Sequence, residues 1–592
     1  MPSPNSAADF LLARLKDWGV RRIFGHPGDG INGVIGALER AGGDFEFIQV
    51  AHEEVGALAA CAHAKFTGEL GVCLATQGPG AIHLLNGLYD AKLDRQPVLA
   101  IVGQPDRAAL GSHFQQEVNL SALFQDVASA YLQTILDPEQ VRHVVDRAVR
   151  IALAERAPTC LIFPHDVQRL KAVPEPPREH GRMHSSVGYT PPQVLPGEPE
   201  LRHAAEVLNG GRRVALLVGS GALGAAAEVR EVAEVLGAGV AKALLGKAVL
   251  PDDLPFVTGT VGWLGTAASN QMMEECDTLL LVGTTMPYTE YLPKPGHAAA
   301  VQIDVSARLV GLRYPTQVNL IGDAAPTLRA LLPMLETKRD RTWRDHVESL
   351  VRDWWAESER RARLEAPPIN PEQVFWELSR RLPDHAILTG DCGTSTVWYA
   401  RDVKLREGMA ASLSGTLATM GSAVPYALAA KFARPLRPVI AMLGDGAMQM
   451  LGQNALITVA KYWQEWPDPR FVVLVLSNRD LNYVSWEQRV MEGFAKYPES
   501  QDLIEFPFAQ TAELLGLRGI RVDRPEDVGR AWDEALASDR PVVLEASVSA
   551  AVPSLPPSLR AEQRRKLEAA LAQGDPDAED VIQQLALHGV TL

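Results

Sequence analysis

The chain has 592 residues, of which 46% are hydrophobic and 22% charged, so it is long enough for several domains with separate cores. The formal net charge of −15 argues against nucleic acid as a partner. The first fifteen residues lack the basic and apolar regions of a signal peptide, and no apolar run is long enough to span a bilayer. The five cysteines form no C-x-x-C pair, so we expect them to be reduced and the protein to be cytoplasmic.

The first third of the chain alternates short apolar runs with glycine-rich turns and helical patterns. A helix is predicted over residues 6–20, and apolar runs at 47–50, 71–75 and 98–103 are typical of buried strands. This alternation predicts a parallel sheet wound by right-handed crossovers. We expect an N-terminal domain over residues 1–180.

Two acidic residues, Glu53 and Glu54, stand where one of these strands joins a helix. They lie in the predicted first helical turn, where negative charge suits the helix dipole. From the residues alone, helix capping is the favoured explanation for both. His83, near the start of a later helix, is as often structural as functional.

A proline-rich, charged stretch at residues 165–200 predicts a linker to a central domain over residues 195–335. The strand predicted at 214–218 leads into Gly219–Gly224, and taken alone this pattern favours a tight turn over a dinucleotide cradle. A charged helical stretch at 336–371, with Trp354 and Trp355 underneath, then links to the last domain.

The C-terminal domain is expected over residues 370–550, with a helical tail at 551–592. One apolar strand ends at Gly444-Asp445-Gly446, and the next ends just before Asn478. Ligands of open α/β sheets bind at that edge, and carboxylate and amide oxygens suit a hard cation. Alone, Gly-Asp-Gly is also an ordinary turn. The strand–turn–helix rhythm echoes the N-terminal domain, which suggests a distant structural repeat.

The chain resembles the thiamine-diphosphate-dependent enzymes of the pyruvate oxidase and acetolactate synthase family, and pyruvate oxidases most. The resemblance is carried by the GDG…N pattern and by the segments VAHEEVGALAA, GVCLATQGPG, FQQEVN, GTTMPY and NYVSWEQ. It implies an α/β fold of three doubly wound parallel-sheet domains. These would bind, in chain order, the pyrimidine of thiamine diphosphate, FAD or a similar nucleotide, and the diphosphate with Mg²⁺.

The resemblance also assigns residues. Asp445, Asn478 and the carbonyl of Asp480 would bind Mg²⁺, and Glu53 would hydrogen-bond the aminopyrimidine. Met420 would bend the cofactor, although a methionine is more often a core gap-filler. Phe114, Gln115 and Glu487 are the other catalytic candidates. The remaining cofactor-binding candidates are Asp29, Gly30, Gly78, His83, Cys392, Gly393, Thr394, Ala418, Thr419, Gly444, Gly446, Ala447, Leu481, Asn482, Tyr483 and Val484.

FAD is implied by segments of the central domain that are similar to the flavin-binding domain of pyruvate oxidases. An arginine often found after the first glycine turn is replaced here by Leu223. The FAD-binding candidates are Gly219, Gly221, Gly259, Thr260, Val261, Gly262, Thr284, Thr285, Met286, Pro287, Tyr288, Asp304 and Asp323.

The implied activity is decarboxylation of a 2-ketoacid, with pyruvate as the expected substrate and oxidation of the enzyme-bound carbanion through FAD. The alternative is a non-oxidative carboligase or decarboxylase, like acetolactate synthase, with FAD absent or structural. A non-enzymatic relative is a third class, disfavoured because Glu53, Asp445 and Asn478 are all present.

The resemblance further implies a homodimer or homotetramer with active sites between subunits. Acetolactate synthases commonly have a tryptophan where Glu487 stands. Trp486 is one residue away and should point elsewhere on a helix. The tail has no strong basic amphipathic face, which gives no support for membrane contact.

Overall fold

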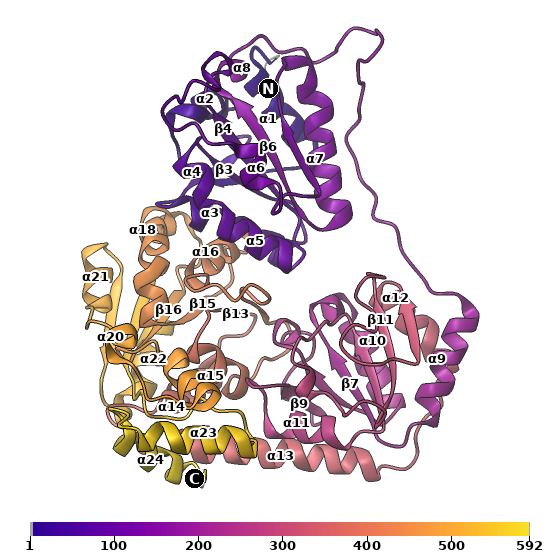
Figure 1. Ribbon diagram of the computed structural model, residues 1–592, viewed down its shortest axis with the longest axis vertical. Coiled ribbons are helices and arrows are strands. Elements are labelled where there is room, and N and C mark those ends of the chain that lie inside the picture. The colour runs from indigo at the N-terminus through magenta and orange to yellow at the C-terminus, as the bar shows by residue number, and fades with distance from the viewer. Residues whose placement is uncertain (1–3, 591) are drawn as a thin grey trace.

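The computed structural model describes residues 4–590 and 592, and it contains three parallel six-stranded sheets, each flanked by helices (Figure 1). Residues 1–3 and 591, which fall inside the expected N-terminal domain and tail, lie outside the described residues. The predicted fold class of three doubly wound α/β units is confirmed. None of the described helices is long and apolar enough to cross a membrane.

The first sheet has the strand order β2-β1-β3-β4-β6-β5. One face buries apolar side chains of α1, α2 and α7, and the other face is covered by α3 and α5. The elements are β1 (Arg22–Gly25), β2 (Glu46–Gln49), β3 (Gly71–Ala75), β4 (Val98–Gln104), β5 (Tyr131–Thr134), β6 (Pro158–Pro164), α1 (Ala7–Asp17), α2 (Asn32–Arg40), α3 (Glu53–Thr67), α4 (Pro79–His83), α5 (Leu85–Leu93), α6 (Leu120–Phe124), α7 (Val141–Glu155) and α8 (His165–Gln168).

The second sheet has the order β12-β11-β10-β7-β8-β9. Its core lies between α9, α10 and α12 on one face and α11 and α13 on the other. The elements are β7 (Val214–Val218), β8 (Gly239–Lys242), β9 (Val257–Thr260), β10 (Thr278–Val282), β11 (Ala299–Asp304), β12 (Val318–Ile321), α9 (Glu198–Gly210), α10 (Ala226–Val235), α11 (Ala267–Glu275), α12 (Ala324–Leu331) and α13 (Thr342–Ala362).

The third sheet has the order β14-β13-β15-β16-β18-β17. Helices α14, α15 and α22 cover one face, and α16, α18 and α21 cover the other. The elements are β13 (Ile387–Gly390), β14 (Ala410–Ser412), β15 (Val439–Gly444), β16 (Phe471–Ser477), β17 (Arg518–Val522), β18 (Val542–Ser547), α14 (Pro371–Arg381), α15 (Thr394–Asp402), α16 (Ala423–Ala433), α17 (Asp445–Ala447), α18 (Gln453–Tyr462), α19 (Asn482–Glu487), α20 (Pro498–Gln501), α21 (Phe508–Leu514), α22 (Val528–Leu536), α23 (Ala561–Ala572) and α24 (Ala578–Leu587).

The first and third sheets are wound in the same way. In each, the first strand has its successor on one side and the third strand on the other, and the last two strands exchange places. The predicted structural repeat is therefore confirmed. In both sheets the winding reverses beside the first strand, and ligands bind outside the carboxyl ends of strands at such a switch point.

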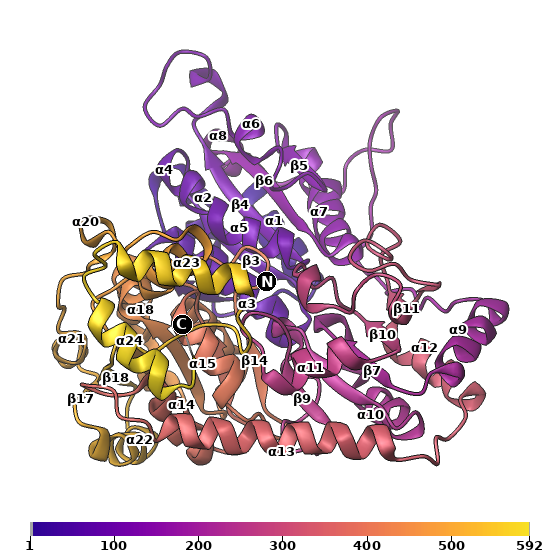
Figure 2. The same ribbon diagram turned by 60° about the horizontal axis from the view of Figure 1, so that its bottom comes forward.

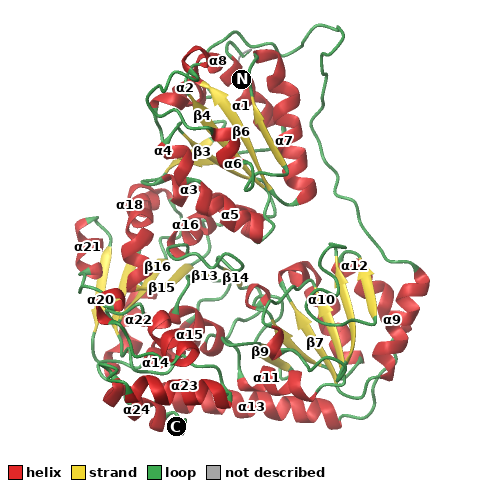
Figure 3. Cartoon of the chain, viewed as in Figure 1, coloured by secondary structure: helices red, strands yellow, loops and turns green. Residues whose placement is uncertain are grey.

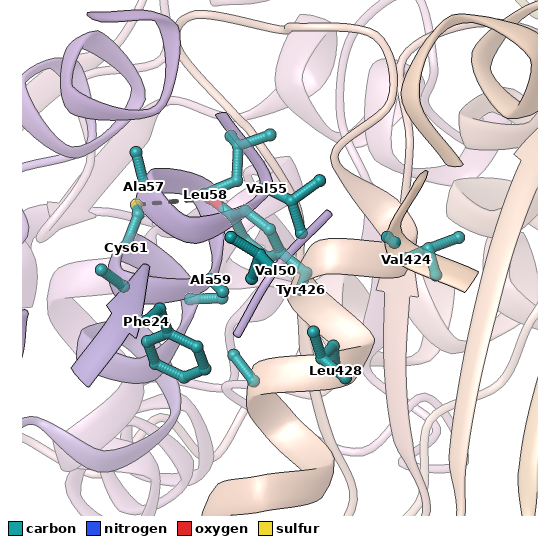
Figure 4. Close-up of a cluster of buried hydrophobic side chains, with 14 of the residues drawn as sticks. Phe24, Val50, Val55, Ala57, Leu58, Ala59, Cys61, Val424, Tyr426 and Leu428 are labelled. Atoms are coloured by element: carbon teal, nitrogen blue, oxygen red, sulfur yellow. Dashed lines mark hydrogen bonds between the residues drawn. The ribbon is translucent and has the colours of Figure 1, made fainter. Parts of the chain in front are cut away.

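The N-terminal and C-terminal domains share one core. Helix α3 lies against α16, and a single apolar cluster extends from the first sheet through both helices to the third sheet (Figure 4). Phe24, Val55 and Leu58 contribute from one side, Val424 and Leu428 from the other, and all are fully buried. Burial of this extent makes the two domains one packed body.

Two connections set the position of the central domain. The stretch 169–197 has no helix or strand among its described residues and runs as a long loop from α8 to α9 (Figure 3). The later connection contains α13, which packs on α11 and on α14 (Figure 1). The tail helices α23 and α24 lie over the C-terminal domain (Figure 2), where Leu567 and Val581 pack with Trp486.

Candidate active site

The carboxyl ends of β15 and β16 bring Asp445 and Asn478 into contact. The Asp445 carboxylate accepts the N–H groups of Asn478 at 3.0 Å, Arg479 at 2.6 Å and Gly446 at 2.9 Å. Asp445 is only 3% exposed, and burial raises the pKa of its carboxyl to about 6 even though these donors lower it. A divalent cation would favour the ionised form, so the residue fits a metal ligand.

Asp480 lies behind this pair with its carboxylate already engaged. It accepts hydrogen bonds from the Ser485 hydroxyl at 2.8 Å and the Asn482 amide at 3.0 Å, and Lys496 lies 3.3 Å away. Between Asn478 and Asp480, Arg479 has a φ of +57°, a conformation that a non-glycine residue adopts only in a constrained turn. The side-chain contacts of Asp480 leave its main-chain carbonyl as the group it can offer to a metal.

Met420 lies close to the Gly-Asp-Gly turn. A Cβ atom added at Gly446 would stand 3.4 Å from the Met420 Cε atom. The turn that carries Met420 is fixed from β13, because the fully buried Asp391 accepts N–H groups of Cys392 at 2.9 Å, Gly421 at 2.8 Å and Ala423 at 2.8 Å. Burial raises the pKa of Asp391 to about 6.

A second group of predicted residues gathers around Glu487. Burial raises the pKa of Glu487, and the charge of Glu487 in turn raises the pKa values of Cys392, Tyr483 and Tyr288. Burial is the larger cause for each of these three groups, and it brings Cys392 to about 11. Tyr288 comes from the central domain and the others from the C-terminal domain, so this partly buried cluster spans a domain boundary.

Trp486 lies outside this cluster. It is 1% exposed, packs with Leu567 and Val581 of the tail, and donates its indole N–H to the Ala550 carbonyl at 3.3 Å. The expectation that Trp486 cannot stand in for the position of Glu487 is therefore confirmed, because one helical step turns the side chain by about 100°.

Glu53 begins α3 and is 9% exposed. Its carboxylate is hydrogen-bonded to His83 Nδ1 at 2.9 Å, and the His83 ring stacks on His52 with centroids 4.4 Å apart. Burial tends to raise the pKa of Glu53, but the bonds from His83 and the backbone outweigh it, so the pKa lies below its ordinary value. Glu53 is therefore ionised at neutral pH. Its carboxylate is engaged by His83, while the side-chain cap of α3 comes from His52, which accepts the Glu54 N–H at 3.2 Å.

The other N-terminal candidates differ in exposure. Gly30 is buried and its N–H already donates to Asp29 at 2.8 Å and to the Thr76 hydroxyl at 3.1 Å. Gly78 has a φ of +58° where α4 begins, and a Cβ there would meet Gln116 at 2.8 Å. Phe114 and Gln115 are exposed in the loop before α6.

The central-domain candidates line the carboxyl edge of the second sheet. Gly219 and Gly221 donate their N–H groups to the carbonyls of Val282 and Gly283, and a Cβ at Gly221 would stand 2.7 Å from the Gly283 Cα atom. These glycines therefore serve the close approach of β7 and β10. Asp304 is buried at the end of β11 and accepts the Ser306 N–H at 2.8 Å, which leaves part of its carboxylate for a ligand.

Among the described residues Glu53 makes no hydrogen bond or ion pair with the C-terminal domain. Its neighbour Glu54 is linked to that domain through Asn86, which donates to Glu54 and to the Thr419 hydroxyl. One important residue was missed by sequence reasoning. Asp391 follows β13 as Asp445 follows β15, and this parallel between Thr-Gly-Asp and Leu-Gly-Asp was a usable signal.

Comparison with known proteins identifies the family. The chain matches, in order, the thiamine pyrophosphate enzyme N-terminal TPP binding domain at residues 5–123, the central domain at 201–331 and the C-terminal TPP binding domain at 391–546. Thiamine pyrophosphate is another name for thiamine diphosphate. The protein therefore belongs to the thiamine pyrophosphate enzyme family.

Curated relatives cover nearly the whole chain. The chain is 36% identical to the putative thiamine pyrophosphate-containing protein YdaP of Bacillus subtilis, over 92% of each chain. It is 30% identical to a probable acetolactate synthase large subunit of Methanocaldococcus jannaschii, over 93% of this chain and 94% of that one. It is 28% identical to the pyruvate oxidase of Lactiplantibacillus plantarum, over 91% and 88%.

Proposed function

We propose that this protein decarboxylates a 2-ketoacid, with pyruvate as the substrate, and passes the electrons to FAD. The observation that carries the proposal is the contact of Asp445 with Asn478 at the ends of two neighbouring strands, beside Met420. Relatives named pyruvate oxidase and acetolactate synthase support a ketoacid substrate. Glu487 stands where acetolactate synthases commonly have a tryptophan, and the neighbouring Trp486 is buried elsewhere. This favours the oxidase over the acetolactate synthase alternative.

Asp445, Asn478 and the Asp480 carbonyl would hold Mg²⁺, and the glycines at 444 and 446 would let the diphosphate approach the backbone. Thiamine diphosphate, when bound, supplies the nucleophile and the electron sink for decarboxylation. Glu53 would hold and exchange a proton at the aminopyrimidine ring, a role for which its ionised carboxylate is suited. Met420 would contact the cofactor and hold it in its bent conformation.

The cluster around Glu487 would contact the ketoacid. Tyr483 and Cys392 belong to it from the C-terminal domain, and Tyr288 belongs to it from the central domain. Burial raises the pKa of Glu487, and its carboxyl would face a substrate oxygen as the acid–base group of this cluster.

FAD would lie along the carboxyl edge of the second sheet, where β7 and β10 flank the switch point. The buried Asp304 and the exposed Tyr288 are the groups best placed to contact it. Gly219 and Gly221 would contribute shape only, because their N–H groups are already used.

We further propose that the protein assembles as a homodimer or homotetramer in which Glu53 of one subunit completes the metal half-site of another. The exposure of Phe114, at 53%, and the lack of a direct bond from Glu53 to the C-terminal domain among the described residues support this arrangement.

Anaerobic mixing of the purified protein with thiamine diphosphate, Mg²⁺ and pyruvate tests the function. A flavin absorption band that bleaches on mixing is expected. Release of CO₂ without bleaching, or without any flavin band, would replace the oxidase with the non-oxidative alternative. No pyruvate-dependent CO₂ or bleaching would overturn the proposed substrate.

A further inference from the structure

The turn that carries Thr419 and Met420 is held by a helix of the N-terminal domain. Asp94, in the cap of α5, accepts the N–H of Gly415 at 2.9 Å and the N–H of Thr416 at 2.8 Å. Lys65 of α3 donates to the Asp94 carboxylate at 2.7 Å and to the Leu413 carbonyl at 2.8 Å. Asp94 and Lys65 are largely buried, so these charge-assisted bonds are shielded from water.

A second carboxylate, Asp90, extends this contact one helical turn earlier. The Ser414 hydroxyl donates to Asp90 at 2.7 Å and accepts the Thr419 N–H at 3.1 Å. The other Asp90 oxygen accepts the Tyr426 hydroxyl at 2.5 Å, and that hydroxyl also lies 3.4 Å from the Cys61 sulfur (Figure 4). Asp90 is fully buried.

The held segment contains a constrained backbone. Ala418 has a φ of +54° and Gly421 a φ of +88°. An alanine keeps a left-handed conformation only where the surroundings over-determine it. Asp391 fixes the far end at Gly421, and Asn86 of α5 donates to the Thr419 hydroxyl at 2.8 Å. The turn is thus held from two sides. Asp391 holds it from the C-terminal domain, and residues of α3 and α5 hold it from the N-terminal domain.

We propose that Asp94 and Asp90 are positioning residues of the active site, which hold the 413–420 segment so that Thr419 and Met420 face the cofactor correctly. This rests on the proposed thiamine diphosphate site. Because α3 also carries Glu53 at its start and Lys65 near its end, the same helix positions the proton-transfer group and the turn under the cofactor. In the proposed assembly Glu53 and the 413–420 segment of one chain belong to two different active sites. The bonds from α3 and α5 to this segment, called the clamp below, would connect the two sites mechanically.

The test begins with hydrogen–deuterium exchange, followed by mass spectrometry, on the full-length protein without cofactor. Asp94→Asn removes one of the two carboxylate oxygens that accept the Gly415 and Thr416 amides, together with the charge, and the milder Ser414→Ala removes the acceptor of the Thr419 amide. Asp146→Asn is the matched control, because Asp146 is an equally buried N-terminal carboxylate paired with Arg14 and remote from the turn. Exchange in 413–421 should accelerate roughly tenfold in the first two variants and stay unchanged in the control.

The second readout is titration of the same variants with thiamine diphosphate and Mg²⁺, followed by tryptophan fluorescence, together with pyruvate turnover. A misplaced turn should lower turnover about 10²-fold, more than it weakens cofactor binding. Unchanged exchange in 413–421 for both variants, or equal acceleration in Asp146→Asn, would overturn the clamp. The exchange result decides this even if the protein shows no turnover with pyruvate, which would instead count against the proposed function.

Discussion

The main-chain N–H of Asn478 donates a 3.0 Å hydrogen bond to the Asp445 carboxylate, so the ends of β15 and β16 are joined through the two residues proposed to bind Mg²⁺. The bond orients a buried carboxylate whose pKa is raised to about 6. A cation bound here would offset the negative charge of the carboxylate, which burial disfavours.

Asp445→Asn should therefore abolish metal-dependent cofactor binding. We expect thiamine diphosphate affinity in the presence of Mg²⁺ to fall by at least about 10²-fold, because even residues that only support metal ligands are worth 10–100-fold. Isothermal titration calorimetry measures the change. Asp468→Asn, which removes an ion pair with Arg470 on the same domain, should bind like the wild type. Unaltered affinity in Asp445→Asn would remove this residue from the metal site.

Glu53→Gln should lower turnover by about 10²–10⁴-fold, the range of positioned acid–base groups, while the Mg²⁺ site on the C-terminal domain stays intact. Glutamine keeps the shape and can still contact His83, but it cannot exchange the proton. Steady-state pyruvate consumption measures turnover. The control is Glu46→Gln, since Glu46 of the same domain pairs with Arg22. An equal loss in both variants would point to a general disturbance of the N-terminal domain.

Substitutions of Trp486 and Glu487 should affect different properties, the first stability and the second catalysis. Trp486→Ala leaves a cavity between α19 and the tail, and emptying a buried aromatic site costs about 3–5 kcal/mol, so the Tm should fall. Glu487→Gln should leave the Tm within a degree or two of the wild type and reduce turnover. Differential scanning calorimetry beside rate measurements checks both. The assignment fails if Glu487→Gln unfolds early while Trp486→Ala does not.

His63 should make the protein less stable in acid. Its imidazole is 6% exposed, and burial, aided by Arg22 and Arg434, lowers its pKa from 6.5 to about 4. The unfolded state binds a proton at His63 more readily than the folded state does. The stability that the neutral ring contributes to the folded state is therefore complete above pH 6.5 and is lost as the pH falls toward 4. The loss relative to His63→Gln amounts to about 3 kcal/mol at most. Urea unfolding of both proteins at pH 7 and pH 4.5 measures it, and a constant difference would contradict the shift.

The sequence predicted well what depends on local pattern. Strand ends at Gly444 and Ser477 follow from apolar runs that stop at polar residues, and parallel pairing then places Asp445 beside Asn478. Helical periodicity predicted that Trp486 points elsewhere than Glu487, and Trp486 packs with the tail. The similar rhythm of the first and last domains suggested a structural repeat, and the same strand order of their two sheets confirms it.

What escaped prediction depends on contacts between distant segments. The bonds from Asp94 to Gly415 and Thr416 join residues more than 300 positions apart, and neither end has a distinctive pattern. The common core of α3 and α16 is equally non-local. The glycine pattern at Gly219 and Gly221 favoured a tight turn, but their close backbone approach to Gly283, which follows a strand distant in sequence, was not predicted.

The central claim is that each active site combines Glu53 of one subunit with Asp445 of another. Co-expression of Glu53→Gln and Asp445→Asn chains with different affinity tags, followed by purification through both tags, gives hybrid dimers. If the sites form between subunits, one site of each hybrid has both residues intact, and the hybrid regains turnover that neither parent shows. If hybrids remain as inactive as the two parents, Glu53 does not act across the subunit boundary and the account is wrong.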